Sequence, residues 1–161
     1  MRRMIALAVF LLLVVATAML SSQFVGGDWY HQKMQQPAWN PPPMVLASVW
    51  AVLYVLIAVS AWLVWDTMRG LAQAALGLWG LQLLLGILWS WMFFGLHRIG
   101  WSLPVMGIWL LLVLVVIKVF RAIKPEAFSL MLPLGVWLLF SLLLNFTQWR
   151  LNGGGIGSVF G

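Results

Sequence analysis

The sequence predicts an all-α integral membrane protein that folds as a single bundle of five transmembrane helices. Of the 161 residues, 64% are hydrophobic and only 7% are charged. The apolar residues fall into five runs, each near the roughly 20 residues that a helix needs to cross a bilayer. A soluble domain requires more charged surface than this, whereas lipid solvates apolar side chains directly. The length suits one compact bundle without a second domain.

The five runs have the composition of membrane-spanning helices. No run carries a charged side chain in its interior, where a charge would cost at least about 2.5 kcal/mol, and Lys118 lies at the end of the fourth run. Backbone groups in lipid must be hydrogen-bonded within their own segment, so each run is expected to be helical. The predicted helices cover 4–25, 44–65, 71–94, 103–119 and 127–149.

The connections between the runs differ in length. The loop over 26–43 is long, polar and rich in proline, whereas the other three connections are short. Consecutive helices are therefore expected to pack antiparallel. Residues 1–152 are predicted to form one transmembrane domain, and residues 153–161, which are rich in glycine, a flexible tail.

Positive charge near the ends of the runs predicts the orientation. Six Lys and Arg residues belong to the N-terminus and to the second and fourth connections, against three at the opposite ends. Cytoplasmic loops carry the excess of Lys and Arg. In a bacterial cell membrane, the N-terminus is therefore expected on the cytoplasmic side and the long loop on the outer side. The six are Arg2, Arg3, Arg69, Lys118, Arg121 and Lys124.

A competing interpretation treats the first run as a signal peptide. Arg2 and Arg3 precede an apolar stretch, and residues 16–18 read Ala-Thr-Ala, which resembles a cleavage site. The apolar run continues past this point to Val25. That continuation favours a retained helix.

Twelve tryptophans are more than the membrane interface alone explains. Indole rings often lie at the level of the lipid headgroups, and five of these residues are near predicted helix ends. Four lie deeper, where two interpretations stay open: packing of the core, or a pocket for a flat aromatic ligand. The first group is Trp29, Trp39, Trp65, Trp101 and Trp149, and the deeper group is Trp50, Trp89, Trp109 and Trp137.

Polar and aromatic residues share a stripe on the fifth run and another on the third. On the fifth they recur at every fourth residue, so on a helix they form a slowly rotating stripe, expected to face the bundle. Gln82, Gly86 and Ser90 align on the third run. Polar side chains usually hydrogen-bond membrane helices together, which explains Gln82 and Ser90; Asn145 suits either this role or ligand binding. The stripe on the fifth run consists of Pro133, Trp137, Ser141, Asn145 and Trp149.

Three blocks of sequence form a specific combined pattern. Residues 29–54 contain Trp-Tyr, then Pro-Ala-Trp-Asn-Pro-Pro, then Val-Trp-Ala-Val-Leu-Tyr. Residues 89–95 read Trp-Ser-x-x-Phe-Phe-Gly, and residues 133–145 carry Pro, Trp, Ser and Asn at every fourth position. In order and position these blocks resemble the tryptophan-rich sensory protein (TspO/MBR) family, called translocator protein or peripheral-type benzodiazepine receptor in mitochondria. The resemblance runs from the first helix to about Asn152.

The resemblance implies a homodimer and a pocket, on the side of the long loop, that binds porphyrins such as protoporphyrin IX or haem. No cofactor is expected to be required. Composition predicts no metal site, because there is no Cys and there are only two His, and no nucleic-acid partner, because the positive residues lie at the ends of apolar runs. The dimer contact would lie on the third helix, where Ala74, Gly77 and Gly80 allow close approach. The predicted ligand-binding residues are Tyr30, Trp39, Trp50, Gly86, Trp89, Trp137, Ser141 and Asn145.

Three positions depart from the family pattern. Gly86 stands where the family usually has Asn, which predicts a larger cavity with weaker or rearranged polar recognition. Leu134 stands where the family has Tyr. Phe146 replaces the Tyr of a short pattern associated with cholesterol, so sterol binding is not predicted.

The chemistry of a porphyrin suggests how such a pocket would work. Stacking of the flat ring on Trp faces contributes about 0.5–1.5 kcal/mol per pair beyond area burial. The propionates would stay near the membrane surface, where they are expected to meet His31, Lys33 or Arg98. The segment 37–43, with its prolines, would be a stiff lid.

Three classes of function follow. The first is a tetrapyrrole-binding membrane protein that senses, transports or disposes of porphyrins. The second is an enzyme that degrades porphyrin oxidatively in light, with Trp50 and Trp137 as redox residues. Ordinary acid–base or metal catalysis is not supported, because no carboxylate lies within a span, both histidines are in loops and there is no Cys. The third, an ion-coupled transporter, ranks last because it would need ionisable residues along the path.

Overall fold

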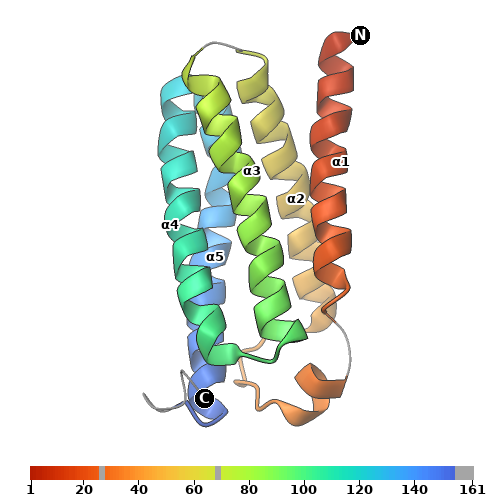
Figure 1. Ribbon diagram of the computed structural model, residues 1–161, viewed down its shortest axis with the longest axis vertical. Helices are drawn as coiled ribbons and strands as arrows, with labels where there is room; N and C mark the ends of the chain where they lie inside the picture. The colour runs from red at the N-terminus through yellow and green to blue at the C-terminus, as the bar shows by residue number, and fades with distance from the viewer. Residues whose placement is uncertain (26–27, 68–69, 155–161) are drawn as a thin grey trace.

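The structure, a computed structural model, describes residues 1–25, 28–67 and 70–154. Within these ranges the chain forms five helices long and apolar enough to cross a membrane, and no described residue lies in a strand (Figure 1). The predicted bundle of five transmembrane helices is therefore confirmed. The helices are α1 (Arg2–Ser22), α2 (Pro43–Trp65), α3 (Leu71–Ser90, continued by the π-helical turn η2, Trp91–Gly95), α4 (Ile99–Ile123) and α5 (Pro125–Leu151).

Two helices begin at proline, and the bounds of α4 differ from those predicted. Pro43 and Pro125 occupy the first helical position of α2 and α5, where the missing N–H costs nothing. α4 begins at Ile99 rather than at 103 and ends at Ile123 rather than at 119, so Lys118 lies inside the helix with an exposed side chain. A lysine in the last turns of a span can extend its amine to the headgroups. Residues 155–161 of the predicted flexible tail lie outside the described residues.

The helices close into a bundle in which α5 packs against both α2 and α4. α1 packs against α2 and α3, and α3 packs against α4. The long first loop, with its π-helical turn η1 (Trp29–Lys33), lies at the same end as the α3–α4 connection and the C-terminal part of α5 (Figure 1). This end is called the loop end below, and the N-terminus lies at the opposite end.

Buried polar atoms join helices in the core. Trp79 on α3 donates its indole N–H to the Ile57 carbonyl of α2 at 3.1 Å, and the ring of Phe10 on α1 contacts Trp79 edge-on at 5.4 Å. Ser60 on α2 donates its hydroxyl to the Ala127 carbonyl of α5 at 2.7 Å. Because lipid offers no alternative partner, such bonds hold helix pairs together in a membrane bundle.

Charged residues pair at the end opposite the loop. Arg3 on α1 forms an ion pair with Asp66 at the end of α2. The Arg3 carbonyl also accepts the indole N–H of Trp62 at 2.9 Å. These contacts attach the first turn of α1 to the last turn of α2.

Candidate functional site

Indole rings from α2, α4 and α5 meet inside the bundle. Trp50 stacks on Trp109 with 5.9 Å between ring centroids and 12° between planes, and it meets Trp137 edge-on at 6.5 Å. Both arrangements suit the charge distribution of aromatic rings. Trp50, Trp109 and Trp137 are called the indole cluster below. The ring contacts continue to the first loop. The ring centroid of Phe140 lies 5.1 Å from that of Trp137, and the ring centroid of Trp39 lies 5.8 Å from that of Phe140.

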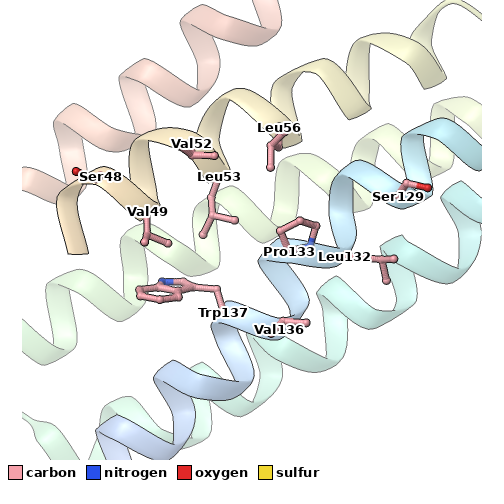
Figure 2. Close-up of a pocket in the computed structure, with 10 residues that line it drawn as sticks. All are labelled: Ser48, Val49, Val52, Leu53, Leu56, Ser129, Leu132, Pro133, Val136 and Trp137. Atoms are coloured by element: carbon pink, nitrogen blue, oxygen red, sulfur yellow. The ribbon is translucent and has the colours of Figure 1, made fainter. Parts of the chain in front are cut away.

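An apolar groove lies between α2 and α5, with Trp137 in its wall (Figure 2). Its volume is about 660 Å³, within the range of roughly 300–1,000 Å³ typical of small-molecule sites. Val52 and Val136 on its rims are 58% and 70% exposed, so the groove opens on the outside of the bundle, where lipid would lie. It is lined by Ser48, Val49, Val52, Leu53 and Leu56 of α2 and by Ser129, Leu132, Pro133, Val136 and Trp137 of α5.

Trp137 belongs to both the groove and the indole cluster. Its side chain forms part of the groove wall, and its ring contacts Trp50 and Phe140. Its indole N–H is buried without a hydrogen-bond partner, which costs about 1–3 kcal/mol. Pro133, one turn earlier, also lines the groove and has no N–H to donate to the Ser129 carbonyl. Trp137 therefore has a buried N–H without a partner, and the Ser129 carbonyl lacks its usual helical donor.

Asn145 is the centre of a buried polar network at the loop side of the bundle. Its side-chain oxygen accepts the indole N–H of Trp89 at 3.1 Å and the hydroxyl of Ser102 at 2.9 Å. Its amide nitrogen donates to the Ile99 carbonyl at 3.4 Å. Trp89 in turn stacks on Phe93 at 5.1 Å. Of the two roles that the sequence left open for Asn145, these contacts are those of a residue that joins α3, α4 and α5.

The first loop is fastened to the end of α5. Gln148 donates its amide to the Tyr30 hydroxyl at 3.1 Å and to the Gln36 side-chain oxygen at 2.7 Å. Gln36 donates back to the Tyr30 carbonyl at 2.9 Å. Asn152 and Gln35 exchange two further bonds of 2.8 and 2.9 Å. Tyr30 is therefore positioned by hydrogen bonds over the end of the bundle, and the loop is anchored on α5.

The larger cavity expected at Gly86 is absent, because the indole of Trp109 fills the space. A Cβ atom built on Gly86 would lie 2.9 Å from two carbons of that indole, closer than real contacts allow. Trp109 is only 4% exposed, and its N–H donates to the Gln82 side-chain oxygen at 3.1 Å. The amide nitrogen of Gln82 is buried without a partner. Glycine at position 86 thus makes room for a tryptophan from α4.

The stripe of every-fourth residues on α5 does not face the bundle over its full length. Pro133 is exposed, Trp137 and Ser141 are half-buried, and Asn145 is buried. Four residues advance slightly more than one helical turn, so the stripe rotates by about 40° per step. The expectation that it faces the bundle is therefore wrong at Pro133 and right at Asn145.

Comparison with known proteins places this fold in a family. The chain matches the TspO/MBR family over residues 5–150. It belongs to the TspO/MBR family. It is 36% identical to the translocator protein of Homo sapiens over 145 residues, which are 84% of this chain and 83% of that protein.

Two bacterial relatives match a larger share of the chain. Protein CrtK of Rhodobacter capsulatus is 31% identical over 153 residues, 91% of this chain and 92% of that protein. Tryptophan-rich protein TspO of Chlorobaculum tepidum is 28% identical over 156 residues, 94% of this chain and 98% of that protein. The family predicted from the sequence blocks is confirmed, and the chain is an integral, multi-pass membrane protein of the TspO type.

The candidate site contains residues that the sequence did not single out as ligand-binding. Trp109 was one of four deep tryptophans, and only the unusual glycine at 86 hinted that a large side chain could lie opposite. Gln148 follows Asn145 by three residues on the same face of α5, a spacing that places both toward the bundle. Phe140 carries no signal that separates it from the other apolar residues of its run.

Proposed function

We propose that this TspO-family protein binds a porphyrin within the membrane, at the indole cluster and the adjoining groove, and acts in porphyrin sensing, transport or disposal. The proposal rests on Trp137, whose side chain takes part in two features. It contacts Trp50 of the indole cluster and also forms part of the wall of an apolar groove of about 660 Å³. A porphyrin is a flat, apolar π-system, so it partitions into lipid and stacks on indole faces. A groove open to lipid admits such a ligand directly from the bilayer.

The propionates of a porphyrin are the part that should stay at the membrane surface. His31, Lys33 and Arg98 are exposed at the loop end, and Arg150 lies near the end of α5. Cations at that level would attract the two carboxylates and orient the ring along the groove. In our proposal the tetrapyrrole therefore lies with its acidic edge toward the loop end.

Titration of the purified protein with protoporphyrin IX tests this proposal. Binding should quench tryptophan fluorescence, and Trp50→Ala and Trp137→Ala should each weaken the Kd by roughly two- to twelvefold, the worth of one ring contact. Trp91→Ala is the matched control, because Trp91 is exposed at the end of α3. Equal Kd values for all four proteins would refute the proposed site, and absence of saturable binding would refute the proposed ligand.

A second candidate is oxidative degradation of the bound porphyrin in light, which the contact of three indoles favours. Adjacent indoles can share an oxidised state, and Trp50 and Trp137 would be the redox residues nearest a ligand in the groove. Absorption spectra and product analysis after illumination in air, with dark samples as controls, test it. An open-chain tetrapyrrole product that is lost in Trp137→Phe would support this activity, and a porphyrin spectrum unchanged by light would exclude it.

We also propose a homodimer through α3. Ala74 and Gly77 are exposed, and a Cβ atom at Gly77 or Gly80 would meet no heavy atom within 4 Å. Small residues on an open helix face permit close approach of a second copy in lipid. Cross-linking between cysteines introduced at position 77 would support this contact, and a monomer in lipid nanodiscs would refute it.

For localisation we propose a bacterial cell membrane with the N-terminus inside. Arg2, Arg3, Arg121 and Lys124 lie at the end opposite the loop, which would be the cytoplasmic end. Arg69, which also counts toward this end, lies outside the described residues. Labelling of a cysteine placed at the N-terminus by a membrane-impermeant reagent, in intact against opened cells, tests the orientation.

A further inference from the structure

Trp109 is the most deeply buried member of the indole cluster. Trp109 of α4 places the edge of its six-membered ring against Gly86 of α3 and stacks on Trp50 of α2. The indole is therefore held between two helices at a place where ring stacking is already favourable. Of the three indoles, Trp137 alone lines the groove, and Trp50 contacts both Trp137 and Trp109.

Two contacts hold this indole in place. Its N–H donates to Gln82, which is fully buried one turn before Gly86. Its outer ring lies so close to Gly86 that no other residue type fits at 86 without a shift. The tryptophan and the glycine thus form a matched pair, in which the indole occupies the volume that a side chain at 86 would otherwise take.

We propose that Trp109 sets the depth of the ligand site: its indole fills an inner compartment over Gly86 and confines a planar aromatic ligand to the outer side formed by Trp50, Trp137 and the groove. This inference rests on the proposed function. Removal of the indole opens the compartment and exposes the second face of Trp50. It also frees the side-chain oxygen of Gln82, which together with the unpartnered amide nitrogen then offers an acceptor and a donor to the pyrrole nitrogens of a tetrapyrrole.

The decisive experiment compares protoporphyrin IX binding by the full chain, Trp109→Ala and Trp79→Ala. Trp109→Ala should tighten the Kd by roughly two- to twelvefold, the gain for one additional ring-face contact. Trp79→Ala is the matched control, because Trp79 is equally buried but contacts Phe10 and Ile57 rather than the indole cluster. Its Kd should stay within about twofold of the unchanged protein, a difference below the weakest ring contact.

A second substitution shows whether the gain comes from the space over Gly86. In the Trp109→Ala background, Gly86→Ala should reverse part of the gain because its methyl group enters the opened compartment. Gly77→Ala, on the same helix with no heavy atom within 4 Å of the added Cβ, should not. If Trp109→Ala fails to fold, as judged by helical circular dichroism and gel filtration, Trp109→Leu replaces it with the same expected direction.

The outcomes separate this inference from the proposed function. An unchanged or weaker Kd in Trp109→Ala, with binding by the wild type intact, overturns the role of Trp109 and leaves the proposed function standing. Binding by Trp109→Ala but not by the wild type supports the role of Trp109 and overturns porphyrin binding as the function of the native chain. Absence of binding by both proteins overturns both.

Discussion

Gly86→Ala is the substitution whose consequence the structure determines most closely. The new methyl carbon would lie 2.9 Å from two carbons of the Trp109 indole, a ring that also stacks on Trp50 and donates its N–H to Gln82. Forcing an extra methyl group into a packed interior typically costs about 1–3 kcal/mol. We therefore expect the free energy of unfolding to fall by about that amount.

The assay is equilibrium unfolding in mixed detergent micelles, with helical circular dichroism as the readout. Gly77→Ala is the matched control, since it adds the same methyl group to the same helix in open space. Gly86→Ala should unfold at a lower denaturant fraction than Gly77→Ala. In a double-mutant cycle, Gly86→Ala should cost little once Trp109 is Ala, because the clashing ring is gone. Equal stability of the two glycine variants, or a cost that persists without the indole, would refute the reasoning.

Three further substitutions test the polar network, the anchored loop and the groove. Asn145→Ala should lower the free energy of unfolding by about 1–2 kcal/mol, because it removes hydrogen bonds between three helices, whereas Thr147→Ala, which bonds only within its own helix, should have little effect. Gln148→Leu should release the first loop from α5 and speed trypsin cleavage at the exposed lysine of that loop. Val136→Trp should fill the groove and weaken protoporphyrin binding severalfold, whereas Leu139→Trp, exposed on α5 outside the groove, should not.

Each of these tests has a result that contradicts it. Unfolding of Asn145→Ala at the same denaturant fraction as Thr147→Ala would show that the network contributes no stability. Unchanged cleavage of Gln148→Leu would mean that other contacts hold the loop. Equal Kd values for the two tryptophan insertions would show that the ligand does not use the groove.

The fold was largely predictable from the chain, and the site only in part. The five runs and their antiparallel order follow from apolar length and short connections, and Gln82, Gly86 and Ser90, which align on the third run, are all buried. The prediction of a larger cavity at Gly86 was wrong because the residue that fills the space, Trp109, comes from another helix. No local pattern in α3 records what α4 presents to it.

Membrane spans are determined by the sequence itself. A charge or an unpaired backbone group in lipid costs free energy in whichever segment contains it, independently of the other segments. The resemblance of the blocks around Trp50, Trp89 and Trp137 to the TspO/MBR family is likewise recognised from the order of the residues alone. Which indoles touch was decided by tertiary structure, since the rotation of each helix about its axis depends on the packing of all five. For that reason Asn145 bonds to Trp89 and Ser102, Trp109 stacks on Trp50, and Trp137 alone of the cluster reaches the lipid-facing groove.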